Sequence, residues 1–169
     1  MGESEKFADD EVKDVQSVHL MAGQRPDGQL IFEKVFANNI GDGCYQLTTS
    51  PVFARGAAKN DVIRLLTAGR FEVEQHNGNL CVRVLAKHNI ALIQQRLAPL
   101  LKPLDAELDY QNERTLVYSI NVKMGFDAIE EAMNEVITDS HQAMWLYANV
   151  YDPLDGETPL NWWHDYLVQ

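Results

Sequence analysis

Five carboxylates on one predicted helix are the residues of this chain whose type and spacing most strongly suggest a chemical role. The helix covers residues 126–141, contains no Lys or Arg, and carries Asp127, Glu130, Glu131, Glu135 and Asp139. Like charges four residues apart on a helix destabilise it by about 0.2–0.5 kcal/mol per pair. A cationic partner would relieve this repulsion and would associate faster through complementary charge. The pattern is typical either of an ordinary solvated helix face or of a surface that binds a basic protein.

The sequence shows no other arrangement of residues that is typical of catalysis or metal binding. The five histidines form no pair spaced to place two ligands on one helix face. Neither Cys44 nor Cys81 lies at a predicted helix start, and no serine lies in a nucleophile elbow. Gly41-Asp42-Gly43 lacks the helix and the lysine of a phosphate loop and predicts a turn. We therefore expect no catalytic residue, no metal site and no cofactor, and two reduced, buried thiols.

Composition narrows the class of partner. The chain has 169 residues, a formal net charge of −11 and 46% hydrophobic residues, which allows one domain or two small packed halves. Nucleic-acid binding requires cations that face phosphates, so this balance argues against it and favours a basic protein partner. No apolar run is long enough to span a bilayer. Residues 1–16 are acidic and lack the features of a signal peptide, so we expect a cytoplasmic protein with a disordered leader.

The elements that position these side chains fall into two halves, of which the first, residues 17–78, predicts short strands. Alternating or apolar stretches predict strands over residues 17–22, 29–36, 44–49, 61–66 and 70–75. Arg25-Pro26-Asp27-Gly28 and His76-Asn77-Gly78-Asn79 have the composition of hairpin turns. Five or six strands at this spacing are typical of a small barrel or a curled sheet.

The second half, residues 79–151, predicts a strand followed by a helix. The helix begins after Asn89, whose side chain is a candidate cap. Its apolar residues recur on one face and are Ile90, Ile93, Leu97 and Leu101. Pro99 is expected to kink this helix or to stop it near Ala98.

A hairpin with its turn at Asn112-Glu113 follows, and then the acidic helix. The last strand, residues 143–151, is apolar on both faces, which predicts a central position in the sheet. The order β-α-β-β-α-β fits a ferredoxin-like arrangement.

The tail, residues 152–169, contains Trp162, Trp163 and Tyr166. Two adjacent tryptophans in water would expose a large apolar area, so we expect the tail to pack back on the core. Aromatic side chains also dominate binding energy at many protein interfaces. The same three residues are therefore predicted to assist the acidic helix as partner-binding anchors.

Three motifs stand in order in the first half. They are Gly41-Asp42-Gly43-Cys44-Tyr45-Gln46-Leu47, Ser50-Pro51-Val52-Phe53-Ala54-Arg55-Gly56 and Asn60-Asp61-Val62. This order resembles a bacterial family built on the domain of unknown function DUF4265, although Asn60 replaces the usual Gly. The resemblance covers residues 17–86 and the second half only in pattern, and it implies a fold and a bacterial origin without any known activity. From the residue types, we expect Phe53 to lie in the core and Asp61 to anchor the corner.

The sequence thus predicts an α+β protein, with a small β-barrel-like N-terminal half packed on a ferredoxin-like βαββαβ C-terminal half. The first functional hypothesis is a non-enzymatic acidic binding protein. Its most concrete form is a bacterial immunity protein or antitoxin that neutralises a basic, nuclease-type toxin. The alternatives are a ligand-binding regulatory or scaffold domain, by analogy with other ferredoxin-like sheets, and an enzyme of unrecognised type.

Overall fold

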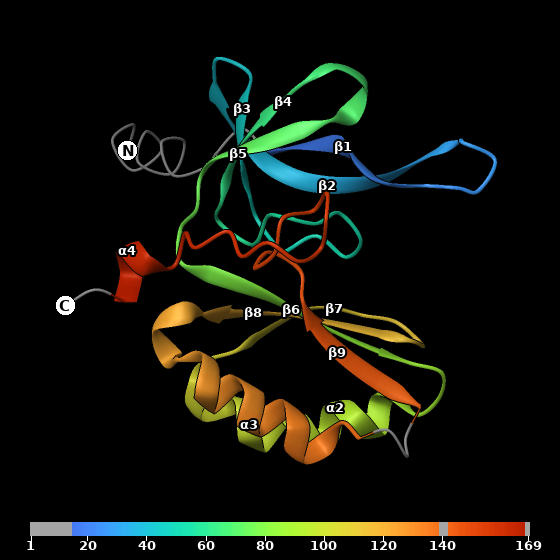
Figure 1. Ribbon diagram of the computed structural model, residues 1–169, viewed down its shortest axis with the longest axis vertical. Coiled ribbons are helices and arrows are strands. Elements are labelled where there is room, and N and C mark those ends of the chain that lie inside the picture. Colours follow the sequence, from blue (N-terminus) through green and yellow to red (C-terminus); the bar gives the residue numbers. More distant parts are fainter. Residues whose placement is uncertain (1–14, 139–141, 168–169) are drawn as a thin grey trace, which may run out of the picture.

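Two antiparallel sheets and a layer of helices make up the computed structural model of this α+β protein, which describes residues 15–138 and 142–167 (Figure 1). The predicted leader up to residue 14 and Asp139 of the acidic helix lie outside these residues. No helix in the described ranges is both long and apolar enough to cross a membrane.

The first sheet contains all five strands predicted for this half. They run in chain order as β1 (Val15–Gln24), β2 (Leu30–Gly41), β3 (Cys44–Leu47), β4 (Val62–Leu65) and β5 (Phe71–Gln75). Each strand is antiparallel to its neighbour. Within the described residues no ladder joins β1 to β5, so the predicted barrel is not closed. The short 3-10 turn η1 (Thr67–Gly69) lies against β1, and the edges of β1 and β5 border a pocket instead.

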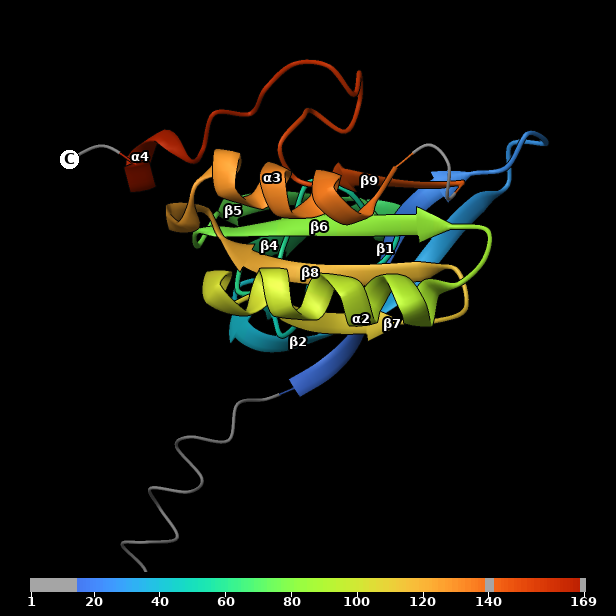
Figure 2. The same cartoon turned by 90° about the horizontal axis from the view of Figure 1, so that it is seen from below.

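The second sheet has the predicted β-α-β-β-α-β order of elements. These are β6 (Asn79–Ala86), α2 (Ile90–Leu101), β7 (Glu107–Gln111), β8 (Thr115–Asn121), α3 (Phe126–Val136) and β9 (Ala143–Tyr147), with 3-10 turns η2 (Lys102–Leu104) and η3 (Val122–Met124). The strand order is β7-β8-β6-β9. Both helices cover one face of this sheet, as Figure 2 shows.

The last strand is therefore at the edge of the sheet, and its predicted central position is wrong. Its apolar residues have another cause, because non-strand elements cover its two faces. Trp145 and Tyr147 pack with the helix-side core. Leu146 and Ala148 pack with Val52 of the first half.

Helix α2 forms on the predicted apolar face, and its buried residues are Ile90, Ile93, Leu97 and Leu101. Pro99 lies inside the helix and does not stop it at Ala98. Its ring is on the exposed side, where water can satisfy the carbonyl that loses its partner. Asn89 adopts a left-handed backbone conformation (φ 65°) and provides no side-chain cap, contrary to expectation.

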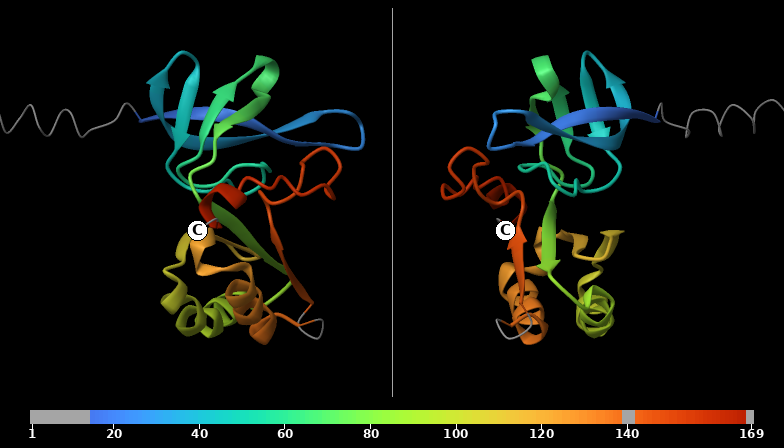
Figure 3. Two further views of the ribbon diagram at one scale, coloured as in Figure 1. Left: turned by 60° about the vertical axis from the view of Figure 1, so that its left-hand side comes forward. Right: turned by 90° about the vertical axis from the view of Figure 1, so that its right-hand side faces the viewer.

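The two sheets are stacked, and the chain crosses between them after β5 (Figure 3). The segment His76-Asn77-Gly78-Asn79 makes this crossing. Its prediction as a hairpin turn is wrong, because β5 and β6 belong to different sheets. The tail after β9 returns alongside the junction and ends in the short helix α4 (His164–Leu167) (Figures 1 and 3).

Candidate functional site

Residues 50–61, which we call the joint segment, link the two sheets through polar contacts on both sides. Glu33 of β2 accepts hydrogen bonds from the backbone amides of Val52, Phe53 and Ala54, at 2.6, 2.8 and 2.8 Å. Arg83 of β6 is buried and donates to the carbonyls of Pro51, Phe53 and Ala54. The Glu33 carboxylate thus binds the amides of this loop and the Arg83 guanidinium binds its carbonyls, so the loop is held from both halves. Phe53 itself is 55% exposed, so its predicted place in the core is wrong.

The interior of this junction also contains a smaller polar network. The hydroxyls of Ser50 and Ser119 lie 2.6 Å apart, and Asp109 accepts from the Ser119 hydroxyl and from the Ser50 amide. Burial raises the pKa of the neighbouring Cys81 thiol, so the thiol stays protonated and is a poor nucleophile. Both cysteines are free and buried, as the sequence predicted.

At the end of the joint segment, Asp61 is fully buried and anchors the corner, as predicted. Its two carboxylate oxygens accept from the amides of Ala58 and Asn77, both at 3.0 Å. Oδ2, the oxygen that accepts from Ala58, also lies 3.1 Å from Nδ1 of His76. A carboxylate that accepts two amide bonds has no proton to offer, so we assign the shared proton to His76 Nδ1.

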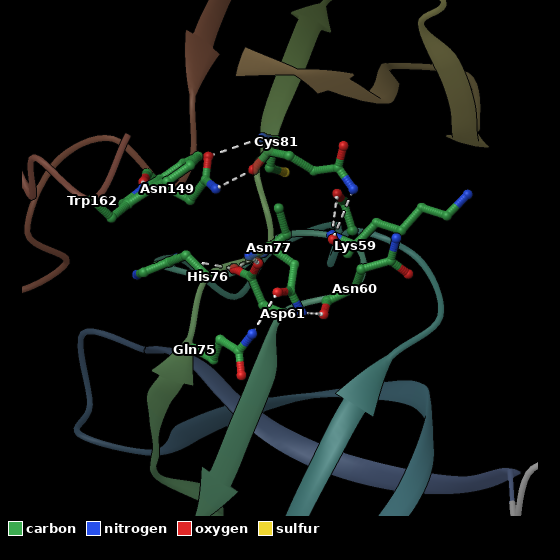
Figure 4. A network of polar contacts seen from close by, with 12 residues as sticks. Lys59, Asn60, Asp61, Gln75, His76, Asn77, Cys81, Asn149 and Trp162 are labelled. Carbon is green, nitrogen blue, oxygen red and sulfur yellow. Dashed lines mark hydrogen bonds and ion pairs between the residues drawn. The ribbon is translucent and has the colours of Figure 1, made fainter. Parts of the chain in front are cut away.

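Two further contacts fix the position of His76, and Figure 4 shows its ring near Asp61 and Trp162. The Trp162 indole stacks on the imidazole with ring centroids 4.9 Å apart and an interplanar angle of 13°. Tyr166 donates its hydroxyl to the His76 carbonyl at 2.5 Å. Trp162 is itself held by a 2.8 Å bond from its indole nitrogen to the Asn149 carbonyl. The remaining ring nitrogen, Nε2, has no hydrogen-bond partner among the described residues.

His76 lies in the wall of a pocket of about 680 Å³, which we call the cleft. Its apolar lining comes from β1, β5 and the tail, and includes Met21, Ala22, Phe71, Val73 and Leu160. Its polar lining includes Arg55, Arg70, Glu72, Asp152 and His76. Pockets of this size and character commonly hold small organic ligands. The open edge of the first sheet, the joint segment and the tail therefore combine to form a cleft with one immobilised imidazole.

The acidic helix is shorter than predicted, and its carboxylates differ in environment. Asp127, Glu131 and Glu135 are exposed at successive four-residue intervals along α3. None of them takes part in the ion pairs found in the described part of the chain. Glu130 is half-buried and accepts a 3.1 Å hydrogen bond from the Tyr147 hydroxyl. Only three of the five predicted acids therefore form an exposed row, while Asp139 lies outside the described residues.

The tail aromatics mainly stabilise the protein itself. Trp163 is 9% exposed and belongs to the core under the second sheet. Trp162 and Tyr166 are half-buried and hold His76. The tail thus packs back on the core, and Trp163 has almost no surface with which to contact a partner.

Sequence reasoning missed the site around His76. The histidine was interpreted only as part of a turn, and Asp61 only as a corner anchor. Their contact joins positions 15 residues apart, and the stacking partner Trp162 comes from the far end of the chain. The single available signal was the clustering of His, Asn and Gly between two strands, which local rules assign to a hairpin. Within residues 15–138 and 142–167, no three His, Cys, Asp or Glu side chains are grouped to hold a metal ion.

Comparison with known proteins identifies the family. The model of a domain of unknown function (DUF4265) matches residues 33–145, which is more than half of the chain. The chain belongs to this family. The DUF4265 match begins in β2 and ends in β9, so it includes the joint segment and His76 but not the tail that completes the cleft.

A solved structure supports the architecture of the DUF4265 chain. A hypothetical protein from Neisseria gonorrhoeae superposes with a TM-score of 0.63 at 15% sequence identity. The alignment covers 82% of this chain and 95% of that protein. Identity this low shows a shared fold only. No curated protein matches the sequence.

Proposed function

We propose that this protein binds a small organic ligand in the cleft, as a ligand-binding regulatory or scaffold domain. The observation that carries the proposal is the cleft of about 680 Å³, in which apolar side chains surround one fixed imidazole. Ligand sites are usually concave, mostly apolar and supplied with a few well-placed polar groups. Contacts that fix His76 before any ligand arrives reduce the entropy lost on binding.

The topology of the second sheet supports the proposal of a ligand-binding domain. The order β7-β8-β6-β9, with both helices on one face, matches the ferredoxin-like arrangement of a βαββαβ unit. We infer that the second half is ferredoxin-like, and that it serves as the base on which the first sheet and the tail build the cleft. Such an analogy concerns the scaffold, whereas ligand binding is inferred from the cleft itself.

A thermal-shift screen against a metabolite library tests the proposal. A ligand that binds only the folded state raises the melting temperature in proportion to its occupancy. Ala22→Trp introduces an indole into the cleft wall and should abolish the shift of any hit. Ala91→Trp makes the same change on the exposed face of α2, away from the cleft, and should preserve the shift. A library without hits, or hits that survive Ala22→Trp, would contradict the cleft as the binding site.

A second candidate function is the binding of a basic protein partner by α3, including a toxin neutralised by an immunity protein. The row of Asp127, Glu131 and Glu135 favours it, because these exposed acids lack cationic partners in the described structure. The row spans about 12 Å at 1.5 Å per residue, a length that suits a cationic groove on a partner.

Charge reversal tests the acidic row. The double variant Glu131→Lys, Glu135→Lys should slow association with a partner recovered from the source cell, with the largest effect at low salt. Glu113→Lys, Glu157→Lys applies the same charge change at two exposed acids outside α3 and the cleft and serves as the control. Equal association rates for both double variants would reject α3 as the contact surface.

A further inference from the structure

The contact between His76 and Asp61 determines which kind of hydrogen bond the imidazole offers to the cleft. Nδ1 donates its proton to the buried Asp61 carboxylate, so in the neutral ring the free lone pair belongs to Nε2. Turning the ring over would replace Nδ1 by a carbon atom and break this hydrogen bond. The Trp162 indole, stacked at 4.9 Å, holds the plane of the ring. Nε2 is therefore an acceptor in a fixed position.

This acceptor is open to the cleft. The side chain of His76 is 20% exposed, and Figure 4 shows the ring extending away from Asp61. In the described part of the chain, the buried polar side-chain atoms without a hydrogen-bond partner belong to Asn38, Arg83 and Tyr118. Nε2 is not one of them, so it reaches solvent, and His76 forms part of the cleft lining. A ligand in the cleft thus meets an acceptor that only a donor group satisfies.

The charges around the cleft favour a ligand without net charge. The charged lining consists of two cations and two carboxylates, which are Arg55, Arg70, Glu72 and Asp152. Their formal charges cancel, and the Asp61 carboxylate behind the imidazole makes the sum negative. An organic anion would therefore gain no net attraction, and an organic cation would lie beside two arginines. A neutral ligand avoids both penalties and the larger cost of removing a charge from water.

We propose that the ligand of the cleft is a neutral, mainly apolar molecule whose hydroxyl donates a hydrogen bond to Nε2 of His76. A hydroxyl suits this place because it donates one hydrogen bond, while its oxygen can still accept from a cationic side chain in the lining. The apolar body of the ligand lies against Phe71, Val73 and Leu160. The inference rests on the proposed ligand-binding function of the cleft and adds the charge and the polarity of the ligand.

The isomers 1-octanol and heptyl methyl ether test this inference, because they have the same atoms and only the alcohol has a hydrogen to donate. NMR titrations at pH 8.5, where imidazole in water is neutral, should give the alcohol an affinity about fivefold higher than that of the ether. Octanoate, whose carboxylate only accepts, should bind more weakly than the alcohol. Equal affinities of the two isomers, or tighter binding of octanoate, would overturn the inference.

The nitrogen NMR spectrum of the His76 ring tests the acceptor directly. At the same pH without ligand, Nδ1 should have the chemical shift of a protonated nitrogen and Nε2 that of an unprotonated one. Addition of 1-octanol should move the Nε2 resonance further than the ether does. A proton on Nε2 in the ligand-free protein would overturn the inference, whatever the affinities of the probes.

The variant His76→Phe keeps an aromatic ring beside Trp162 and removes the acceptor. The preference for the alcohol should vanish while the ether still binds. His88→Phe, at an exposed histidine before α2, should keep the preference. A preference that survives His76→Phe would overturn the hydroxyl inference and leave the cleft proposal standing. Binding of neither isomer to the unmodified protein would overturn it as well, and the thermal-shift screen with Ala22→Trp decides the cleft proposal separately.

Discussion

The acidic helix and the cleft are two candidate surfaces of opposite origin. Every carboxylate of the exposed row belongs to one helix and is spaced by the helical repeat. The cleft takes its lining from β1, the joint segment, β5, the crossing to β6 and the tail, which are segments far apart along the chain. The row of acids requires only that α3 forms, whatever the helix packs against. The cleft, in contrast, exists only when all its segments have packed together. A site formed by distant segments is therefore more specific evidence of function than a local run of charge.

Asp61→Ala should produce the largest effect, because Asp61 is the buried acceptor that holds His76 in the cleft wall. The change leaves the Ala58 and Asn77 amides and His76 Nδ1 without their acceptor in a buried place. Since each of these three losses costs about 1–3 kcal/mol, we expect the free energy of unfolding to fall by at least about 3 kcal/mol. Urea denaturation measures it, with Asp165→Ala on the surface of α4 as control. Equal midpoints for the two variants would show that the Asp61 contacts contribute little.

The next largest effect is a loss of stability at alkaline pH, which involves Tyr118 on the helix side of the second sheet. Burial raises the pKa of Tyr118 from 10.0 to about 12. Between these values the unfolded chain releases a proton that the folded protein keeps, so stability falls as pH rises through this window. The expected slope reaches about 1.4 kcal/mol per pH unit. Urea midpoints between pH 9 and 11 should fall less for Tyr118→Phe than for the unmodified protein; parallel curves would contradict the assignment.

Two adjacent acids of α3, Glu130 and Glu131, allow a half-buried contact and an exposed charge to be compared on one helix. Glu130→Ala removes the acceptor of the Tyr147 hydroxyl and should destabilise the protein by about 1 kcal/mol. Glu131→Ala removes like-charge repulsion with Asp127 and Glu135 and should stabilise it by about 0.3 kcal/mol. Burial, followed by the charge of Glu130, raises the pKa of Tyr147, so Glu130→Ala should lower that pKa partway toward its ordinary value. Thermal denaturation and a tyrosine titration measure these effects. Identical behaviour of both variants would show that the two acids have equivalent environments.

The smallest expected effect concerns the tail beside the cleft. Hydrogen bonds from the Thr158 hydroxyl and from the Thr158 and Glu157 amides lower the pKa of Asp155 from 3.8 to about 2. The stabilisation is present above the ordinary pKa and is lost as pH falls through about 2. Thr158→Ala should move the Asp155 pKa toward its ordinary value, as followed by NMR titration of the carboxyl carbon. A pKa unchanged in Thr158→Ala would mean that the backbone amides alone hold the turn.

Local elements were predictable because their causes are local. The buried face of α2 follows directly from the spacing of Ile90, Ile93, Leu97 and Leu101. Pro99 was misjudged because the cost of proline inside a helix depends on whether the freed carbonyl meets water, which sequence spacing does not specify. The edge position of β9 was missed because a helix and a loop, rather than neighbouring strands, cover its apolar faces.

The sequence by itself determined the strands, the two main helices, the acidic surface charge and membership of a family, since each depends on residue type and short-range periodicity. Tertiary structure alone decided that the first sheet stays open, that the His76 segment crosses between sheets, and that Trp162 stacks on the ring held by Asp61. The reason is physical: Asp61 is fully buried in the folded protein. Its demand for hydrogen-bond donors then selects partners that lie far apart along the chain.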